Sequence, residues 1–187
     1  MELFDLYDMD RNRTGKTMVR GEDVPEGYCR LIVHICVFSP DGRMLIQKRQ
    51  PFKDNWSGLW DLSVGGSATL GDDSRSAAER ELREELGLEE DFSVLRPVLT
   101  IHWRDGFDDF YVLTRDLEPA DLCLQPEEVE TARWAGEAEI LALIDGGEFI
   151  PYQKGLINLL FVLRNHRGSH TRPDWTERTV SGGPADN

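Results

Sequence analysis

The chain has 187 residues, of which 40% are hydrophobic and 30% charged, as in a soluble globular domain with short extensions. Asp and Glu number 35 against 21 Lys and Arg, which gives a formal net charge of -14. This balance argues against a duplex nucleic-acid-binding module and against docking on anionic lipid, because both need a basic surface. It does not exclude a phosphate substrate, since bound divalent metals can supply the positive charge.

The cysteines and the apolar runs bear on the compartment. Cys29, Cys36 and Cys123 are odd in number and have no paired spacing, which favours a reducing environment over a disulfide framework. No apolar run approaches the roughly 18 residues of a membrane span, and the first residues lack the profile of a signal peptide. We therefore expect a cytoplasmic protein without a membrane partner.

The first expected elements are a hairpin and a central strand. Leu3 to Tyr7 and Lys16 to Arg20 can pair around the polar turn DMDRNRTG. From Leu31 to Phe38 the chain alternates between two faces that are both mostly apolar, which is typical of a strand covered on both sides. Met44 to Arg49 returns as the next strand after the turn Pro40-Asp41-Gly42.

Two motif fragments fall in the hairpin turn. A calcium-binding loop that began at Asp8 would need Gly and Glu where Arg13 and Val19 stand. The run Thr14 to Thr17 resembles the end of a phosphate-binding P-loop, but the earlier glycine is replaced by Asp10. We reject both motifs and interpret this stretch as a solvated turn.

A strong helix signal follows a short strand, Leu62 to Gly66, that ends in two glycines. The predicted helix runs from Asp73 to Leu86. Asp73 or Ser74 can cap its start, and Gly87 can end it in the left-handed conformation. The buried stripe consists of three apolar residues spaced four apart: Ala78, Leu82 and Leu86.

The rest of the chain completes an α/β pattern. We predict strands at Val94 to Trp103, Asp109 to Thr114 and Ala132 to Ala135. Helices are expected at Glu137 to Ile144 and Tyr152 to Arg164. From residue 166 to residue 187 the chain is polar and rich in Gly, Pro and Ser, which favours an extended tail.

Three carboxylates share one face of the helix at 73–86. At 100° per residue, Glu81 and Glu85 lie one turn apart, and Glu84 lies about 60° from Glu81. Like charges at these spacings destabilise a helix. Arg80 and Arg83 compensate in part, and bound Mg²⁺ or Mn²⁺ would do the rest.

A solvated acidic face is the alternative interpretation of such a run. The flanking glycines favour a ligand site instead. Gly65 and Gly66 let the backbone turn tightly and approach a ligand closely, and Gly87 ends the helix. The order is strand, glycine loop, acidic helix and glycine stop.

Residues 66–88, GSATLGDDSRSAAERELREELGL, resemble the Nudix box, G-x5-E-x7-R-E-U-x-E-E-x-G-U, in which U is a bulky aliphatic residue. One defined position departs, because Asp72 stands where the family has its first glutamate. The side chain is one methylene shorter, and we expect activity to survive the change. The matching positions are Gly66, Arg80, Glu81, Leu82, Glu84, Glu85, Gly87 and Leu88.

The resemblance implies an α/β/α sandwich around a mixed β-sheet, here with an N-terminal β-hairpin and a polar C-terminal tail. We divide the chain into a hairpin extension (1–27), a Nudix hydrolase domain (28–165) and the tail (166–187). The implied reaction is metal-dependent hydrolysis of a diphosphate linkage by water attack on phosphorus. The substrate class is a nucleoside di- or triphosphate, a nucleotide derivative or a related diphosphate ester.

The resemblance also assigns roles to residues. Glu81, Glu84 and Glu85 would bind Mg²⁺ or Mn²⁺, with the carbonyl of Gly66 as a further ligand, and Arg80 would orient the carboxylates. The general base would be Glu81 or a glutamate of a later loop. The segment 125–134, QPEEVETARW, resembles the Nudix segment that often supplies such a base, and its candidates are Glu127 and Glu128. A solvated loop is equally compatible with that segment.

Several residues near the glycine loop are candidates for substrate binding. Lys48 and Arg49 end a strand and could meet phosphate oxygens, although a solvated strand end is the alternative. Trp60 could stack on a base or line a pocket, and ordinary core is its alternative. Gly65 and Glu127 complete this set. We interpret His34 as a core histidine with satisfied hydrogen bonds rather than as a ligand.

Two other functions are weighed against hydrolysis. The N-terminal LFDLYDMDRNRTGKT and the following strand are similar to a branch close to type I isopentenyl-diphosphate isomerases. Those enzymes use a cysteine and a histidine where this chain has Gly65 and Ser67, so the isomerase is disfavoured. The other alternative, a catalytically silent module that binds a nucleotide, has no need for three crowded glutamates. The expected partner is a small-molecule diphosphate, and the possibility of a homodimer stays open.

Overall fold

The computed structural model describes residues 2–165 and 168–170. In this part of the chain a seven-stranded mixed sheet is built around β3 (Arg30–Phe38). β3 pairs in parallel with β8 (Gly106–Thr114) along its whole length and antiparallel with β6 (Val64–Ser67). The other strands are β4 (Met44–Arg49), β5 (Trp60–Asp61), β7 (Leu99–Trp103) and β9 (Val129–Ala135).

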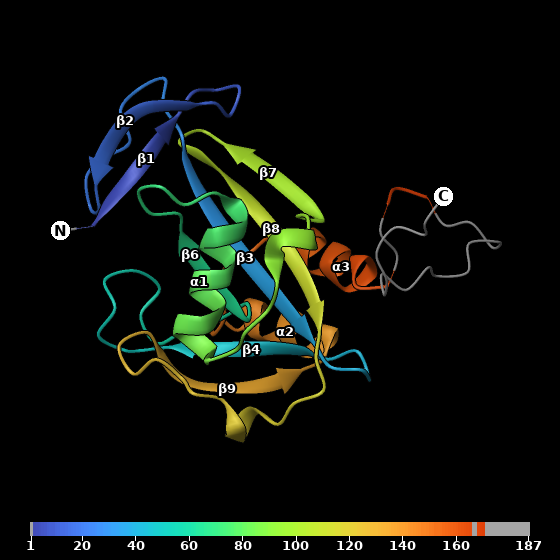
Figure 1. Cartoon of the computed structure of the whole chain (residues 1–187). Coiled ribbons are helices and arrows are strands. Elements are labelled where there is room, and N and C mark those ends of the chain that lie inside the picture. Colours follow the sequence, from blue (N-terminus) through green and yellow to red (C-terminus); the bar gives the residue numbers. More distant parts are fainter. Residues whose placement is uncertain (1, 166–167, 171–187) are drawn as a thin grey trace.

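Helices cover both faces of this sheet (Figure 1). α1 (Ser74–Leu86) lies in front of β3 in that view, and α2 (Glu137–Asp145) and α3 (Lys154–Leu163) lie behind it. Two short 3-10 helices, η1 (Phe92–Val94) and η2 (Pro119–Asp121), sit in the connections. This arrangement confirms the predicted α/β/α sandwich. No helix among the described residues is both long and apolar enough to cross a bilayer.

The alternation of β3 divides the core into two clusters, as predicted. Its odd-numbered residues from Leu31 to Val37 face α1 and pack against Ala78 and Leu82. On the opposite face, Cys36 and Phe38 join the cluster that contains α2 and α3. A strand that is apolar on both faces is therefore buried between two helical layers.

α1 begins and ends where the sequence predicts. The side chain of Asp73 accepts hydrogen bonds from the backbone N–H groups of Arg75 and Ser76, both at 2.9 Å. Ser76 returns a hydrogen bond to the backbone N–H of Asp73, which completes a capping box. Gly87 ends the helix at φ 68°, a conformation that favours glycine.

The predicted hairpin is present as a separate two-stranded sheet of β1 (Leu3–Tyr7) and β2 (Arg13–Val19). β2 begins three residues before the predicted strand and ends one residue before its predicted end. The hairpin has its own small core of Phe4, Leu6 and Met18. Tyr7 joins it to the main domain by two backbone hydrogen bonds with Cys29, both 2.8 Å long.

Some strand boundaries differ from the prediction for identifiable reasons. The strand expected from Val94 begins only at Leu99, because Asp91 caps η1 and Pro97 has no N–H to donate. The strand expected at 62–66 begins only at Val64 and ends at Ser67. Before it, the hydroxyl of Ser63 donates to the carbonyl of Leu45 and accepts from a backbone N–H of β3. Of the predicted tail, 166–167 and 171–187 lie outside the described residues.

Candidate active site

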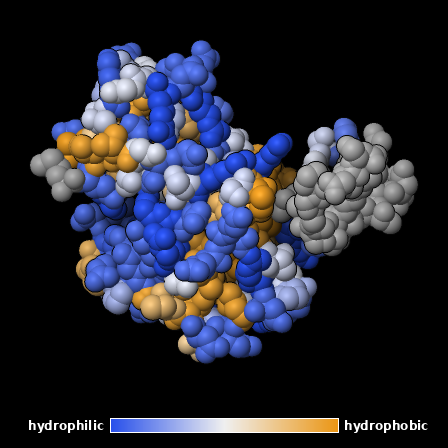
Figure 2. Space-filling view, viewed as in Figure 1, coloured by the Kyte–Doolittle hydropathy of each residue, from blue (hydrophilic) through white to orange (hydrophobic). Residues whose placement is uncertain are grey.

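The acidic face of α1 lies beside the glycine strand β6. The apolar stripe fixes the helix against the sheet, and the glutamates are thereby carried to the edge of β6. Gly66 lies directly under the carboxylate of Glu81, and a Cβ added at this glycine would collide with it. A larger residue at this position would displace the Glu81 carboxylate from its place beside the strand. Figure 2 shows that the surface over α1 is mainly hydrophilic.

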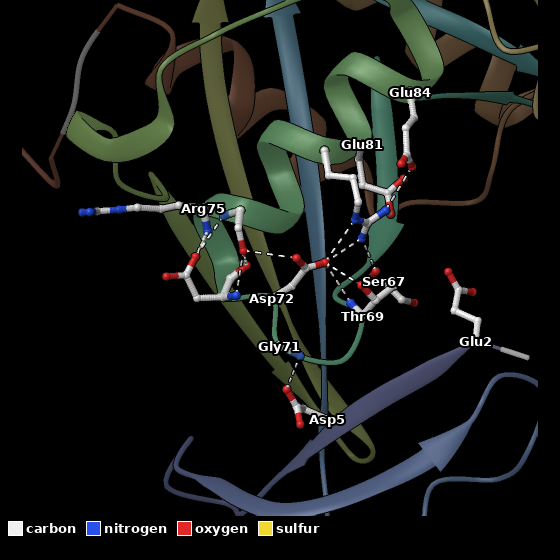
Figure 3. Close-up of polar contacts among 12 residues, drawn as sticks. Glu2, Asp5, Ser67, Thr69, Gly71, Asp72, Arg75, Glu81 and Glu84 are labelled. Atoms are coloured by element: carbon white, nitrogen blue, oxygen red, sulfur yellow. Dashed lines mark hydrogen bonds and ion pairs between the residues drawn. The ribbon is translucent and has the colours of Figure 1, made fainter.

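Asp72 and Arg80 connect the loop before α1 to the helix. The Asp72 carboxylate accepts from Arg80 Nη2 at 2.9 Å and Nε at 3.1 Å, and from the N–H and hydroxyl of Thr69 (Figure 3). Burial raises the pKa of Asp72, but the hydrogen bonds from Thr69 and Arg80 outweigh it and hold the pKa below the ordinary value. Arg80 also donates to the carbonyl of Ser67 at 3.1 Å. The shorter aspartate therefore still forms an ion pair with the arginine.

The same guanidinium holds two glutamates. Arg80 Nη1 lies 2.9 Å from Glu81 Oε1 and 3.1 Å from Glu84 Oε2. The side chain of Glu81 is 12% exposed and that of Glu84 is 44% exposed, so the two carboxylates line a path from the interior to solvent. Burial raises the pKa of Glu81, and the charge of Arg80 opposes that shift. Arg80 thus contacts both glutamates that it is predicted to orient, and its role stays a prediction.

Glu85 is the deepest of the three carboxylates. It is 4% exposed and accepts a hydrogen bond of 2.8 Å from Gln47 Nε2 of β4. Burial and then the charge of Glu81 raise the pKa of Glu85 well above the ordinary value, against the hydrogen bond from Gln47. A buried carboxylate that gains so little from cations is costly to ionise. This cost would be relieved by a positive ion.

The donor set suits a hard divalent cation. It offers three carboxylates and the carbonyl of Gly66, and oxygen ligands of this kind are those that Mg²⁺ prefers. Within residues 2–165 and 168–170, no three acidic, histidine or cysteine side chains converge on one point as they stand. The reason is visible in the contacts, because Glu81 and Glu84 share Arg80 as their cation while Glu85 is turned to Gln47. The oxygen donors are thus of the type that a divalent metal takes, but the carboxylates would have to turn from Arg80 and Gln47 to share one ion.

The later loop reaches the end of α1. The backbone N–H of Gln125 donates to the carbonyl of Glu85 at 3.0 Å, which places the segment QPEEV beside the acidic face. Glu128 forms an ion pair of 2.6 Å with Lys53, whereas Glu127 is exposed. Of these two predicted base candidates, Glu128 is therefore the one held in a defined place, and its role stays a prediction.

The predicted substrate-binding residues lie around β4, β5 and β6. Lys48 pairs with Glu130 at 3.3 Å, and Arg49 approaches Asp61 at 3.6 Å. Trp60 is covered by the guanidinium of Arg133, 4.6 Å from the ring centroid. These side chains lie on two neighbouring strands, and their assignment to substrate stays a prediction.

Gly65 lies opposite His34 in the pairing of β6 with β3. A Cβ at Gly65 would stand 3.1 Å from His34 Nδ1. The imidazole is largely buried, as predicted for a core histidine, but Nδ1 has no hydrogen-bond partner among the described residues, so the predicted satisfaction of its hydrogen bonds is not found at this nitrogen. The imidazole stacks on Phe110 with centroids 4.6 Å apart.

A polar pair near this site, the buried Asp61 and the partly buried Tyr152, was not predicted. Asp61 is 6% exposed, and its carboxylate accepts from the hydroxyl of Tyr152 at 2.9 Å. Burial raises the pKa of Asp61 and of Tyr152 above their ordinary values. Their separation of 91 residues left no local signal in the sequence. An acidic residue in the apolar run WDLSV was the available hint.

Comparison with known proteins gives concordant matches. The family model described as "NUDIX domain" matches residues 30–153. An uncharacterised Nudix hydrolase of Listeria monocytogenes is 46% identical over 170 residues, covering 91% of this chain and 99% of that protein. An isopentenyl-diphosphate Delta-isomerase of Kocuria rhizophila is 28% identical over 155 residues, covering 77% and 83%. A crystal structure from Deinococcus radiodurans aligns with a TM-score of 0.69 and 25% identity, covering 85% and 97%.

Proposed function

The chain belongs to the Nudix family and is a Nudix hydrolase, and from this premise we propose that it hydrolyses a small-molecule diphosphate with the carboxylates of α1 as its metal-binding groups. Nudix hydrolases act on pyrophosphate-type linkages and generally use divalent metal ions. The observation that carries the proposal is the acidic face itself. Glu85 is buried with no ion pair to a cation of the described residues, next to Glu81, which lies against Gly66.

In the proposed site, Glu81, Glu84, Glu85 and the Gly66 carbonyl hold Mg²⁺ or Mn²⁺. When bound, the ion supplies charge neutralisation of the diphosphate and lowers the pKa of a coordinated water. Arg80 keeps Glu81 and Glu84 oriented through its Nη1. A bound cation would favour the ionised form of Glu85 and so oppose the effect of burial, which raises the pKa of this carboxylate. Metal binding would therefore stabilise the folded site.

In the reaction, a water oxygen forms a bond to one phosphorus and the bond from that phosphorus to the bridging oxygen breaks. One proton of the water passes to a carboxylate, and the bridging oxygen leaves with the second phosphate. Glu81 is our proposed base, since burial raises the pKa of this carboxylate beside Gly66. Glu128, whose carboxylate lies 2.6 Å from Lys53 Nζ, is the second candidate.

The substrate class that we propose is a nucleoside di- or triphosphate, a nucleotide derivative or a related diphosphate ester. Arg49 and Lys48 would contact phosphate oxygens, Trp60 would pack against the group beyond the diphosphate, and Gly65 and Glu127 would border it. Lys48 is paired with Glu130 of β9 and Arg49 with Asp61 of β5. We also propose a cytoplasmic location.

Two other activities are less well supported. An isomerase would need an acid-base pair at the glycine strand, where this chain has Gly65 and Ser67 in place of a thiol and an imidazole. His34 lies next to Gly65 but is stacked on Phe110. A silent nucleotide-binding module would gain nothing from burying Glu85, which costs folding free energy.

A phosphate-release panel tests the proposal. Nucleoside di- and triphosphates, nucleotide sugars, dinucleotides and isoprenoid diphosphates are incubated with the protein and Mg²⁺, Mn²⁺ or chelator. We expect metal-dependent hydrolysis of one group, which also identifies the substrate class. Rearrangement of the double bond of isopentenyl diphosphate without phosphate release would favour the isomerase. Ligand binding without turnover would favour the silent module.

A further inference from the structure

The N-terminal hairpin holds the backbone of the loop that precedes α1. The N–H of Leu70 donates to the carbonyl of Leu3 at 2.8 Å, which continues the edge of β1 into the loop. The N–H of Gly71 donates to Asp5 Oδ2 at 2.9 Å (Figure 3). Gly71 has φ 90°, a conformation that favours glycine. Two consecutive loop N–H groups are thus bound by one strand of the hairpin.

Arg13 of β2 binds the same loop through its carbonyls. Its guanidinium donates to the carbonyl of Gly71 at 3.3 Å and to the carbonyl of Asp72. Asp5 lies 3.8 Å from the same guanidinium, so the two charged residues support each other. Together they satisfy the N–H of Gly71 and the carbonyls of Gly71 and Asp72.

These contacts lead directly to the acidic face of α1. The backbone of Asp72 is held by Arg13, and its carboxylate holds Arg80. Arg80 in turn holds Glu81 and Glu84. An aspartate is shorter than the glutamate usual in the Nudix box, so its reach to Arg80 depends more on where the loop backbone lies. The hairpin fixes that backbone.

A second anchor fixes the hairpin itself. Arg11, in the turn between β1 and β2, forms an ion pair with Asp109, which is 0% exposed. Its guanidinium also lies 4.7 Å above the ring of Phe107. Asp109 accepts a hydrogen bond of 2.6 Å from the hydroxyl of Ser74, the first residue of α1. The hairpin and the start of the helix are therefore joined to one buried carboxylate.

The hairpin also borders the site in space. A depression of about 420 Å³ has Glu2 and Leu3 on one side and Arg80 and Glu84 on the other. In Figure 3, Glu2 extends from the hairpin on the side of the site where Glu81 and Glu84 lie. Residues of the hairpin and of the acidic face of α1 therefore line the same depression.

We propose that Asp5 and Arg13 are positioning residues, which fix the loop 70–72 so that Asp72 and Arg80 hold the metal-binding carboxylates in place. The proposal rests on the proposed function, because it concerns the same site. It adds the hairpin, which lies outside the Nudix box, to the machinery on which metal affinity depends.

The test is Mn²⁺ binding, measured by calorimetry or electron paramagnetic resonance on the full chain. We expect Arg13→Ala and Asp5→Ala to raise the Mn²⁺ dissociation constant about 10-fold, in the range found when a residue that orients a metal ligand is removed. Lys16→Ala is the matched control, because Lys16 lies on the same strand and contacts Tyr28 instead of the loop. It should bind Mn²⁺ as the wild type does. If turnover is found, kcat should fall in the two variants with little change in KM.

A double-mutant cycle separates positioning from general destabilisation. If Arg13 acts through Arg80, then Arg13→Ala should add little to the loss already caused by Arg80→Ala. Arg13→Lys keeps the charge and guards against a folding failure, but an ammonium cannot span two carbonyls as a guanidinium does, so it should recover only part of the affinity. Unchanged Mn²⁺ affinity in Arg13→Ala and Asp5→Ala, or losses that simply multiply, would overturn the proposal.

The outcome is distinguishable from that of the proposed function. Weaker Mn²⁺ binding in Arg13→Ala, together with silence across the phosphate-release panel, would uphold the hairpin's role and reject hydrolysis. Metal-dependent hydrolysis that is indifferent to both hairpin variants would do the reverse. A wild-type protein that binds no Mn²⁺ would overturn the positioning proposal together with the metal site.

Discussion

The two long faces of α1 contribute to stability with opposite signs. One face consists of small and branched apolar residues that are at most 1% exposed: Ala77, Ala78, Leu82 and Leu86. The other carries Glu81, Glu84 and Glu85, which repel one another. The first face stabilises the fold by removing apolar surface from water. The second face costs folding free energy, which a bound cation would offset.

The raised pKa values on the acidic face determine how its carboxylates affect folding stability at neutral pH. Burial raises the pKa of both Glu81 and Glu85, so the folded state holds their protons more tightly than the unfolded chain does. At neutral pH the ionised carboxylates therefore oppose folding in the absence of metal. Substitutions on the two faces should in consequence separate stability from activity.

Leu82→Ala should have the largest effect, on the apolar face. Truncation of this buried leucine should lower the free energy of unfolding by about 3 kcal/mol, through lost burial and the cavity left behind. Urea unfolding followed by circular dichroism measures the loss. The folded variant should keep kcat within a small factor of wild type. A large fall in kcat without loss of stability would show that the two faces are not separate.

Glu85→Gln should lower activity and leave the fold intact, the reverse of Leu82→Ala. We expect kcat to fall about 100-fold, which corresponds to about 2.7 kcal/mol in activation free energy, because the proposed metal ligand loses its charge while the shape is kept. Steady-state kinetics on the substrate found in the panel measures this. Glu79→Gln, on an exposed position of the same helix, is the matched control and should be silent. Equal activities of the two variants would refute the assignment of Glu85.

Arg80→Ala should give a smaller loss. Arg80 orients Glu81 and Glu84 without being a proposed metal ligand, so we expect kcat/KM to fall about 30-fold, or about 2 kcal/mol. Higher metal concentration should recover part of the activity. Kinetics at several Mg²⁺ concentrations tests this, and a loss that no metal concentration relieves would instead place Arg80 on the substrate.

The smallest effect is on the pH dependence of stability. The folded pKa of Glu85 lies above its ordinary value of 4.5, so its stabilising contribution is complete below that pH and is lost as pH rises toward the folded pKa. Denaturant titrations in chelator should therefore show wild-type stability falling above about pH 5. Glu85→Gln should flatten that fall, although Glu81 still contributes in the same direction. An unchanged slope would mean that the folded pKa of Glu85 is not raised, as for a well-solvated carboxylate.

Local patterns predicted much of this molecule. The Nudix box, both ends of α1 and the two apolar faces of β3 follow from short-range spacing, and the structure bears them out. Contacts between residues far apart in the chain could not be predicted from local sequence patterns. Arg11 was interpreted as part of a solvated turn, yet it pairs with Asp109, 98 residues away. The contacts of Arg13 with the loop before α1 arise in the same way.

Mn²⁺ binding to the wild type, Glu85→Gln and Glu79→Gln tests the central claim most directly. Titration calorimetry on the three proteins at one neutral pH needs no knowledge of the substrate. The account predicts that the wild type and Glu79→Gln bind Mn²⁺ alike and that Glu85→Gln binds it far more weakly. Equal binding by all three proteins would contradict the claim that the buried acidic face of α1 is the metal site.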